Sequence, residues 1–297
     1  MSKVLESVSE ELAALVASVP GIVRVEGRKR MAASGVSWAE EGVLVTADHV
    51  VRQEAPLRIG LPDGETGQAS LVGRDPSTDL AVLRLDSGRL ASPAWRTTDD
   101  LKVGHLALAV GRPGRSVQST FGIVSAVGGA FQTSVGGSID RYLQTDAVMY
   151  PGFSGGALVT ADGRVAGLMT SGLLRGVSLA IPTETVRRVV ETLLKHGKIR
   201  RGFLGVGVQP VRMPESAASR SGQPDGLLVM SVEPGSPADQ AGLMLGDTLL
   251  TIEGIHLESI EGLFGALTGE RVGKPVELRV LRGGEVRPLQ VTIGERD

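Results

Sequence analysis

The sequence predicts a mainly β protein that is divided into two units. Glycine supplies 41 of the 297 residues and aromatic residues only 3%, a composition typical of many short strands joined by tight turns. From residue 21 to about residue 188, short apolar segments alternate with turn residues, as in an antiparallel sandwich or barrel. A single hydrophobic core seldom grows far beyond roughly two hundred residues, so a second unit is expected.

Residues 1–20 are expected to form an amphipathic helix that docks on the protein and is a candidate oligomerisation segment. Glu6, Glu10 and Glu11 stand where a secretion signal would be basic. We therefore expect a cytoplasmic protein. The alternative is a periplasmic or exported protein whose leader has been removed, and the absence of cysteine fits both compartments. The apolar positions at helical spacing are Val4, Val8, Leu12, Leu15 and Val19.

The first unit is expected to span residues 21–196. A run of helical periodicity at 183–196 closes it, because Gly197 follows at the position where glycine commonly ends a helix. Its clearest strand candidates are 42–46, 80–85, 106–110, 165–169 and 177–181.

The second unit is expected at 201–297, after a short linker at 197–202. It is β-rich, with a first strand at 203–208 and a helix at 259–267. The stretch 214–226 is rich in Ser, Pro and Gly and follows that first strand, so it is interpreted as a polar loop inserted into the unit.

The composition argues against several function classes. Acidic and basic residues nearly balance, with a formal charge of -2, so a nucleic-acid partner is not expected. The sequence has no cysteine, and its four histidines form no His-Glu-x-x-His pair, so neither a metal nor a cofactor is expected. It also has no apolar run long enough to be a transmembrane segment.

A serine lies among glycines in the segment 151–158, between two apolar stretches. Small neighbours let the backbone turn tightly and point amide groups at a substrate oxygen. Acyl transfer needs this arrangement, with Ser154 as nucleophile and the N–H groups of Gly152 and Ser154 as the oxyanion hole. Such a loop also occurs as a plain turn, so the motif alone is weak evidence.

A histidine and an aspartate stand at the ends of apolar strands. His49 directly follows the strand at 42–46, where a neutral imidazole would be well placed to accept the serine proton. Asp79 directly precedes the strand at 80–85, where its carboxylate would orient the imidazole. Asp75, before Pro76, is interpreted as capping a turn, although spacing alone does not exclude an exchange of roles.

The chain order His49, Asp79, Ser154 is that of chymotrypsin-type enzymes. With these residues in place, nearly the whole chain resembles the HtrA/Deg family of trypsin-like serine proteases. Further matching segments are 34–36, 110–114, 121–126, 144–147 and 180–182.

The resemblance implies a chymotrypsin-like fold: two six-stranded antiparallel β-barrels, followed by an α+β PDZ domain. It further implies an ATP-independent endopeptidase that cleaves unfolded or damaged polypeptides, with the His49–Asp79–Ser154 triad between the barrels. The protein is expected to be a homotrimer assembled through the N-terminal segment, as in the family.

The second unit carries its own part of the resemblance. The segment from Arg201 to Val206 is similar to the carboxylate-binding loop of PDZ domains, and 235–247 is typical PDZ sequence. Successive amides can hold a peptide C-terminus beside a strand edge and a helix. The expected peptide-binding residues are Phe203, Leu204, Gly205 and Val206.

The sequence departs from the family at Tyr150 and Phe153, where many members have Asn. Phe153 lies between the oxyanion glycine and the nucleophile, so the conformation of this loop without substrate is left open. Met149, Met169 and Gly172 are the candidates for the specificity pocket. By resemblance they imply cleavage after a small aliphatic residue.

Two functions remain in competition at this point. The first is an active endopeptidase. The second is a catalytically silent, protease-like scaffold that acts as a PDZ adaptor or chaperone. All three triad residues are present, which favours the enzyme.

Overall fold

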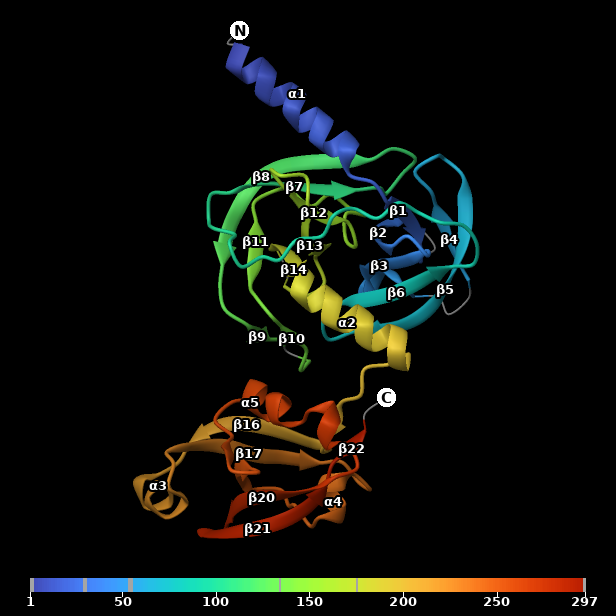
Figure 1. Ribbon diagram of the computed structural model, residues 1–297. Helices are drawn as coiled ribbons and strands as arrows, with labels where there is room; N and C mark the ends of the chain where they lie inside the picture. The colour runs from blue at the N-terminus through green and yellow to red at the C-terminus, as the bar shows by residue number, and fades with distance from the viewer. Residues whose placement is uncertain (1–2, 29–30, 53–55, 134, 175, 296–297) are drawn as a thin grey trace. The chain divides into compact units, whose positions relative to one another are not determined.

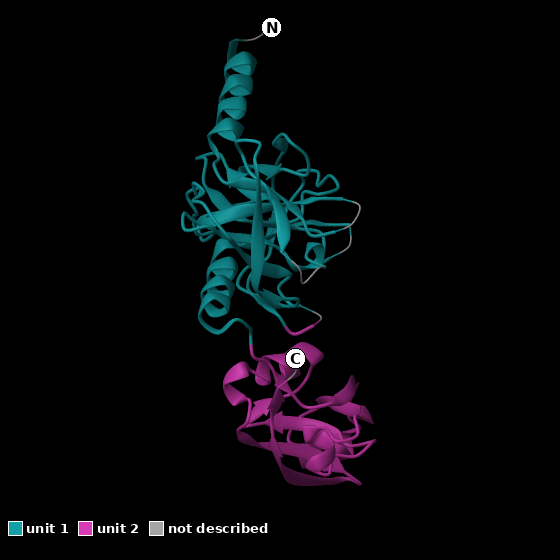
Figure 2. Ribbon diagram, turned by 90° about the vertical axis from the view of Figure 1, so that its right-hand side faces the viewer, with its two compact units in different colours: residues 1–133, 137–199 teal, residues 134–136, 200–297 magenta. Residues whose placement is uncertain are grey.

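The computed structural model describes residues 3–28, 31–52, 56–133, 135–174 and 176–295. The chain separates into two compact units (Figure 2), one of residues 1–133 and 137–199 and one of residues 134–136 and 200–297. No helix of the described residues is both long and apolar enough to span a bilayer.

The first unit contains two closed antiparallel barrels, as the resemblance implies (Figure 1). Closure pairs every strand on both sides and leaves no free edge. The first barrel has the order β1-β2-β3-β6-β5-β4. Its strands are β1 (Ile22–Glu26), β2 (Ala33–Ala39), β3 (Val43–Ala47), β4 (Leu57–Gly60), β5 (Thr66–Asp75) and β6 (Leu80–Leu85).

The second barrel has the order β11-β14-β13-β12-β7-β8. A short hairpin, β9 (Phe131–Gln132) with β10 (Ser138–Ile139), extends from it. One apolar cluster includes buried residues of both barrels, among them Val45 and Val159, so packing fixes one barrel against the other. Its strands are β7 (Leu106–Gly111), β8 (Gln118–Val127), β11 (Leu143–Thr145), β12 (Ala157–Thr160), β13 (Val165–Thr170) and β14 (Ser178–Pro182).

In the described part of the first unit, two helices flank the barrels. α2 (Thr183–His196) buries four of the five apolar residues that the periodicity predicts and leaves Leu194 exposed, and Gly197 ends the helix at φ 72°. α1 (Lys3–Ser18) has no fully buried residue. Its C-terminal half packs on the barrel core through Leu12, Leu15 and Val16, whereas Val4 and Leu5, nearer its start, are 69% and 66% exposed.

The turn between β12 and β13 holds an ion-paired carboxylate, Asp162. Partial burial raises its pKa, but hydrogen bonds from Thr160 and Arg164 and the charge of Arg96 outweigh burial and lower the pKa to about 2. The Arg96 contact is 2.9 Å long, from Nη1 to Oδ2.

The second unit is a sheet in the order β16-β17-β18-β20-β21, with β16 at one edge. The expected strand at 203–208 divides in two around Leu204 and Gly205, because Gly205 turns the chain at φ 81°. The expected polar loop contains a short helix, α3 (Glu215–Ser221). The helix expected at 259–267 is α5 (Ile260–Ala266), capped by the Ser259 hydroxyl, which accepts from Gly262 N.

The remaining elements complete this unit around its own apolar cluster. They are β15 (Gly202–Phe203), β16 (Val206–Arg212), β17 (Asp225–Val232), α4 (Pro237–Gln240), β18 (Thr248–Ile252), β19 (Ile255–His256), η2 (Gly269–Arg271), β20 (Pro275–Arg282), β21 (Glu285–Thr292) and β22 (Gly294–Glu295).

Candidate active site

His49 and Asp79 meet because they sit at the adjacent ends of two paired strands. β3 pairs with β6 up to Ala47 and Leu80, and His49 follows β3 in the single turn η1 (Asp48–Val50). His49 Nδ1 lies 2.8 Å from Asp79 Oδ2 and 3.0 Å from Oδ1, and the His49 backbone N–H donates to Oδ1 at 2.9 Å. Asp79 is only 4% exposed. A carboxylate that accepts at Nδ1 leaves Nε2 as the basic nitrogen.

Thr170 and Gly172 complete the surroundings of Asp79. The Thr170 hydroxyl donates to Asp79 Oδ2 and accepts from Gly172 N at 2.9 Å. A Cβ on Gly172 would lie 2.6 Å from Asp79 Oδ2 and 2.7 Å from His49 Nδ1. The backbone at residue 172 therefore covers the His–Asp pair so closely that only glycine fits.

Asp75, the alternative carboxylate, is engaged in its own turn. Its Oδ1 accepts from Ser77 N at 3.1 Å and from Ser77 Oγ at 2.8 Å, and its Oδ2 accepts from Thr78 Oγ1 at 2.8 Å. These bonds shape the loop that presents Asp79 at φ 57°. The structure thus brings Asp79, and not Asp75, to the histidine.

The serine loop is a tight turn, and two of its backbone carbonyls accept hydrogen bonds from Ser34. Gly152 has φ 90°, and Phe153 N donates to Tyr150 O at 3.0 Å. Ser34 donates twice to this loop, from Oγ to Gly152 O at 2.7 Å and from N to Ser154 O at 3.2 Å. Both carbonyls thus bond to β2. The amide groups of Gly152 and Ser154 have no acceptor among the described residues. Two free amides beside a serine can bind an oxyanion.

Phe153 anchors this loop. Its ring is 1% exposed within the apolar cluster of the second barrel and lies edge-on to Tyr150, with ring centres 5.9 Å apart. A Cβ on Gly111 would be 3.2 Å from the Phe153 ring. The sequence left the conformation of this loop open. In the structure the Phe153 side chain is part of the hydrophobic core, and it packs against Gly111, where a larger residue would not fit.

The Ser154 hydroxyl hydrogen-bonds to Ser171 Oγ at 3.1 Å. Among the described residues it makes no hydrogen bond to His49. Bonds between nucleophile and base are often long or absent until substrate binds. Ser154 is 7% exposed, in the same unit as the His–Asp pair.

Two arginines contact residues 48 and 49. Arg28 Nη2 donates to His49 O at 3.1 Å, and Arg74 Nε pairs with Asp48 Oδ1 at 2.5 Å. Burial raises the pKa of Asp48, an effect that the bond from Arg74 opposes. Burial and the nearby charge of Arg52 lower the pKa of Arg28.

The three candidates for the specificity pocket have different environments. Met169 is fully buried in the cluster that contains Phe153, and its backbone pairs with the serine loop through Gly155 N at 2.8 Å. Met149 is partly buried against the same cluster. Gly172 lies on the His–Asp pair, as described above.

Sequence reasoning missed three residues that hold the site: Ser34, Thr170 and Ser171. The signal available for Thr170 and Ser171 was their position directly after an apolar strand, the same context that identified His49. Nothing in the sequence pairs Ser34 with a residue 118 positions away.

The second unit has a separate candidate peptide site at the free edge of β16, against which α5 lies. Leu204 O accepts from Ala238 N and Gly205 O from Glu233 N, both at 2.9 Å. The amides of Leu204 and Gly205 have no acceptor among the described residues. They precede Val206, whose partly buried side chain packs on the unit's core. An edge strand preceded by free amides fits a peptide C-terminus.

The fold and these sites define a trypsin-like peptidase joined to a PDZ domain. The family models of these two domains, "Trypsin-like peptidase domain" and "PDZ domain", match residues 33–168 and 202–293. The chain covers 98% of a solved "HtrA-type protease AlgW with decapeptide" at 30% identity and a TM-score of 0.78. It covers 98% of the "serine endoprotease from Yersinia pestis" at 30% identity and the same TM-score. Each match extends over 96% or more of this chain. The protein belongs to the HtrA family.

The curated relatives are longer proteins than this chain, and the similarity covers only part of each. The "Probable periplasmic serine endoprotease DegP-like" of Chlamydia muridarum is 34% identical over 276 residues, 91% of this chain and 55% of the relative. The protein with the same name in Halomonas elongata is 35% identical over 282 residues, 93% of this chain and 59% of the relative. The chain thus spans just over half the length of these relatives. Their names contradict the cytoplasmic location expected from the N-terminal acidic residues, so that expectation is wrong.

Proposed function

We propose that the protein is a serine endopeptidase located in the periplasm, acting on unfolded or damaged polypeptides. The observation that carries the proposal is the buried Asp79 carboxylate, which is hydrogen-bonded to His49 in the same unit as Ser154 and two free amides. Ser154 is the nucleophile, His49 the general base and Asp79 its orienting carboxylate. Gly152 N and Ser154 N form the oxyanion hole.

The reaction follows from this geometry. The Ser154 hydroxyl turns from Ser171 toward His49 Nε2, which takes its proton as Oγ attacks the substrate carbonyl. The negative charge that develops on the carbonyl oxygen is bound by the amides of Gly152 and Ser154. The imidazolium then gives its proton to the leaving amine. His49 Nε2 then deprotonates a water molecule that attacks the acyl carbonyl. The bond between the acyl carbon and Ser154 Oγ breaks, the carboxylic acid product leaves, and the imidazolium returns its proton to Oγ.

The apolar pocket that we propose for the residue before the cut is built on Met149, with Met169 behind it and Gly172 beside it. Partly buried Met149 offers apolar surface, and fully buried Met169 supports the wall from within. Such a pocket favours a small aliphatic residue. Profiling a peptide library tests this assignment, and cleavage mainly after Arg or Lys would contradict it.

The proposed organisation has three parts: a helix at 1–20 through which three copies assemble, a protease domain at 21–196, and a PDZ domain at 201–297. Phe203, Leu204, Gly205 and Val206 would bind peptide C-termini. The exposed apolar residues of α1 support the first assignment and the free edge of β16 the last. Light scattering of the chain with and without residues 1–20 measures the molar mass and tests the trimer. If this segment assembles the trimer, the shorter form should have the mass of a monomer.

Covalent labelling with a fluorophosphonate tests the chemistry. Wild type should be labelled and Ser154→Ala should not, whereas Ser171→Ala, the matched control for a neighbouring hydroxyl, should still be labelled. Turnover of an unfolded protein should fall by about four to six orders of magnitude in Ser154→Ala or His49→Ala, with little further loss in the double variant. Folded wild type that neither labels nor cleaves would favour the scaffold function instead.

A further inference from the structure

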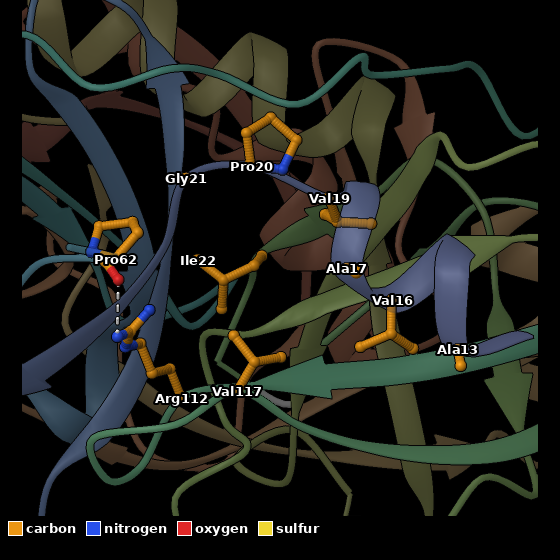
Figure 3. A pocket seen from close by; sticks show the side chains of 10 residues that line it. All are labelled: Ala13, Val16, Ala17, Val19, Pro20, Gly21, Ile22, Pro62, Arg112 and Val117. Carbon is orange, nitrogen blue, oxygen red and sulfur yellow. Dashed lines mark hydrogen bonds between the residues drawn. The ribbon is translucent and has the colours of Figure 1, made fainter. Parts of the chain in front are cut away.

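A cavity of about 390 Å³ lies between the C-terminal half of α1 and the barrels (Figure 3). Its walls are apolar side chains and backbone, with one exception, the guanidinium group of Arg112. In Figure 3 that group lies at the opposite end of the cavity from Ala13 and Val16 of α1, so the cavity has a cationic end and an apolar end. The other lining residues are Ala17, Val19, Pro20, Gly21, Ile22, Pro62 and Val117.

Arg112 is a buried charge without a counter-charge. The residue is 7% exposed, and its Nη2 donates to Pro62 O at 3.2 Å and Arg115 O at 2.7 Å. The other side-chain N–H groups have no acceptor among the described residues, and no carboxylate there lies within ion-pair distance. Neutral donors would serve two carbonyls equally well. These N–H groups are not among the buried unpaired polar atoms of the described residues, so they are open to an anionic ligand, the usual partner of a cation in a little-exposed residue.

We propose that this cavity binds an aliphatic carboxylate. The carboxylate group accepts hydrogen bonds from the unused N–H groups of Arg112, a geometry that guanidinium groups favour. The hydrocarbon tail lies against Val16, Val19 and Val117. A peptide is the poorer occupant, because the apolar walls would leave its amide groups without partners. The volume is that of a small-molecule site.

Calorimetry with octanoate, and with octan-1-ol as its uncharged match, tests the proposal on the full chain. Octanoate should bind wild type, and octan-1-ol should bind at least about tenfold more weakly, as expected for loss of a hydrogen bond to a charged group. Arg112→Gln keeps a donor for the carbonyls but removes the charge, so it should weaken octanoate binding by about 10- to 150-fold. Arg115→Gln is the matched control, because exposed Arg115 contributes only its carbonyl.

Val16→Trp provides a second test that leaves Arg112 intact. The larger side chain fills the α1 end of the cavity and should abolish octanoate binding, even if Arg112→Gln fails to fold. Three results would overturn the proposal: no octanoate binding to wild type at millimolar concentration, equal binding to the Arg112→Gln or Val16→Trp variant, or binding of an apolar tripeptide in place of octanoate. None of these measurements depends on protease activity.

Discussion

Replacing Thr170 by Val removes one hydroxyl from the buried wall around Asp79 and keeps the shape of the side chain. The Thr170 hydroxyl donates to Asp79 Oδ2 and accepts from Gly172 N. A hydrogen bond to a charged group contributes about 1.5 to 3 kcal/mol. Each 1.36 kcal/mol of transition-state stabilisation is about tenfold in rate. If the bond is needed to hold the carboxylate while the imidazolium forms, kcat/KM should fall by about 10- to 150-fold.

Hydrolysis of an internally quenched peptide measures this change, with the concentration of competent enzyme determined by fluorophosphonate titration of Ser154. Thr160→Val is the matched control. Thr160 is 3% exposed, and its hydroxyl also donates to a carboxylate, Asp162, at 2.6 Å, but in the turn after β12. We expect Thr160→Val to lower the melting temperature without lowering kcat/KM per active site.

The outcome of the pair is decisive. If Thr170→Val retains kcat/KM within twofold of wild type, the hydroxyl does not hold Asp79 for catalysis. If Thr160→Val lowers kcat/KM as much as Thr170→Val does, the loss reflects general stability and not the triad. Either result would contradict the proposed role of the Thr170 hydroxyl.

Three further predictions concern backbone fit and charge. Gly172→Ala should lower kcat at least tenfold, because its Cβ would lie 2.6 Å from Asp79 Oδ2; steady-state kinetics measures it. Asp162→Asn should lower the free energy of unfolding at pH 7, and urea titration should show the difference shrinking between about pH 4 and pH 2. The ionised carboxylate stabilises the fold above its unfolded pKa, near 4, and loses that effect through its folded pKa of about 2. Gly205→Ala should abolish binding of peptide C-termini, because its Cβ would lie 2.2 Å from Ser236 Cβ; fluorescence anisotropy measures it.

Each of these predictions has a control. Gly129→Ala puts the same substitution in open space at a residue without a positive φ, so it should keep kcat. In the second unit the control is Gly235→Ala, because Gly235 has a positive φ like Gly205 but open space around it. For Asp162→Asn the control is exposed Asp99→Asn, which should leave the free energy of unfolding at pH 7 unchanged. Unchanged kcat in Gly172→Ala, a difference for Asp162→Asn that persists at pH 2, or normal peptide binding by Gly205→Ala would contradict the respective prediction.

The pattern of residues along the chain predicts strands, helices and the reactive side chains at their ends. Apolar periodicity predicts α2 over 183–196, the same residues that the structure shows, and places His49 after β3 and Asp79 before β6. These features are local: a strand or a helix is specified by the spacing of its own residues, and a turn by the residues within it. The predicted cytoplasmic location is wrong, because acidic residues near the N-terminus do not specify a compartment.

Which residues surround the candidate triad depends on the folding of the whole first unit. It brings Asp79 to His49 and leaves Asp75 in its turn, buries Phe153 in the second barrel, and joins Thr170 to Asp79 across 91 positions of sequence. It also leaves Arg112 in an apolar cavity without a counter-charge. Such contacts depend on the packing of two closed barrels and a helix, and no periodicity along one segment encodes them.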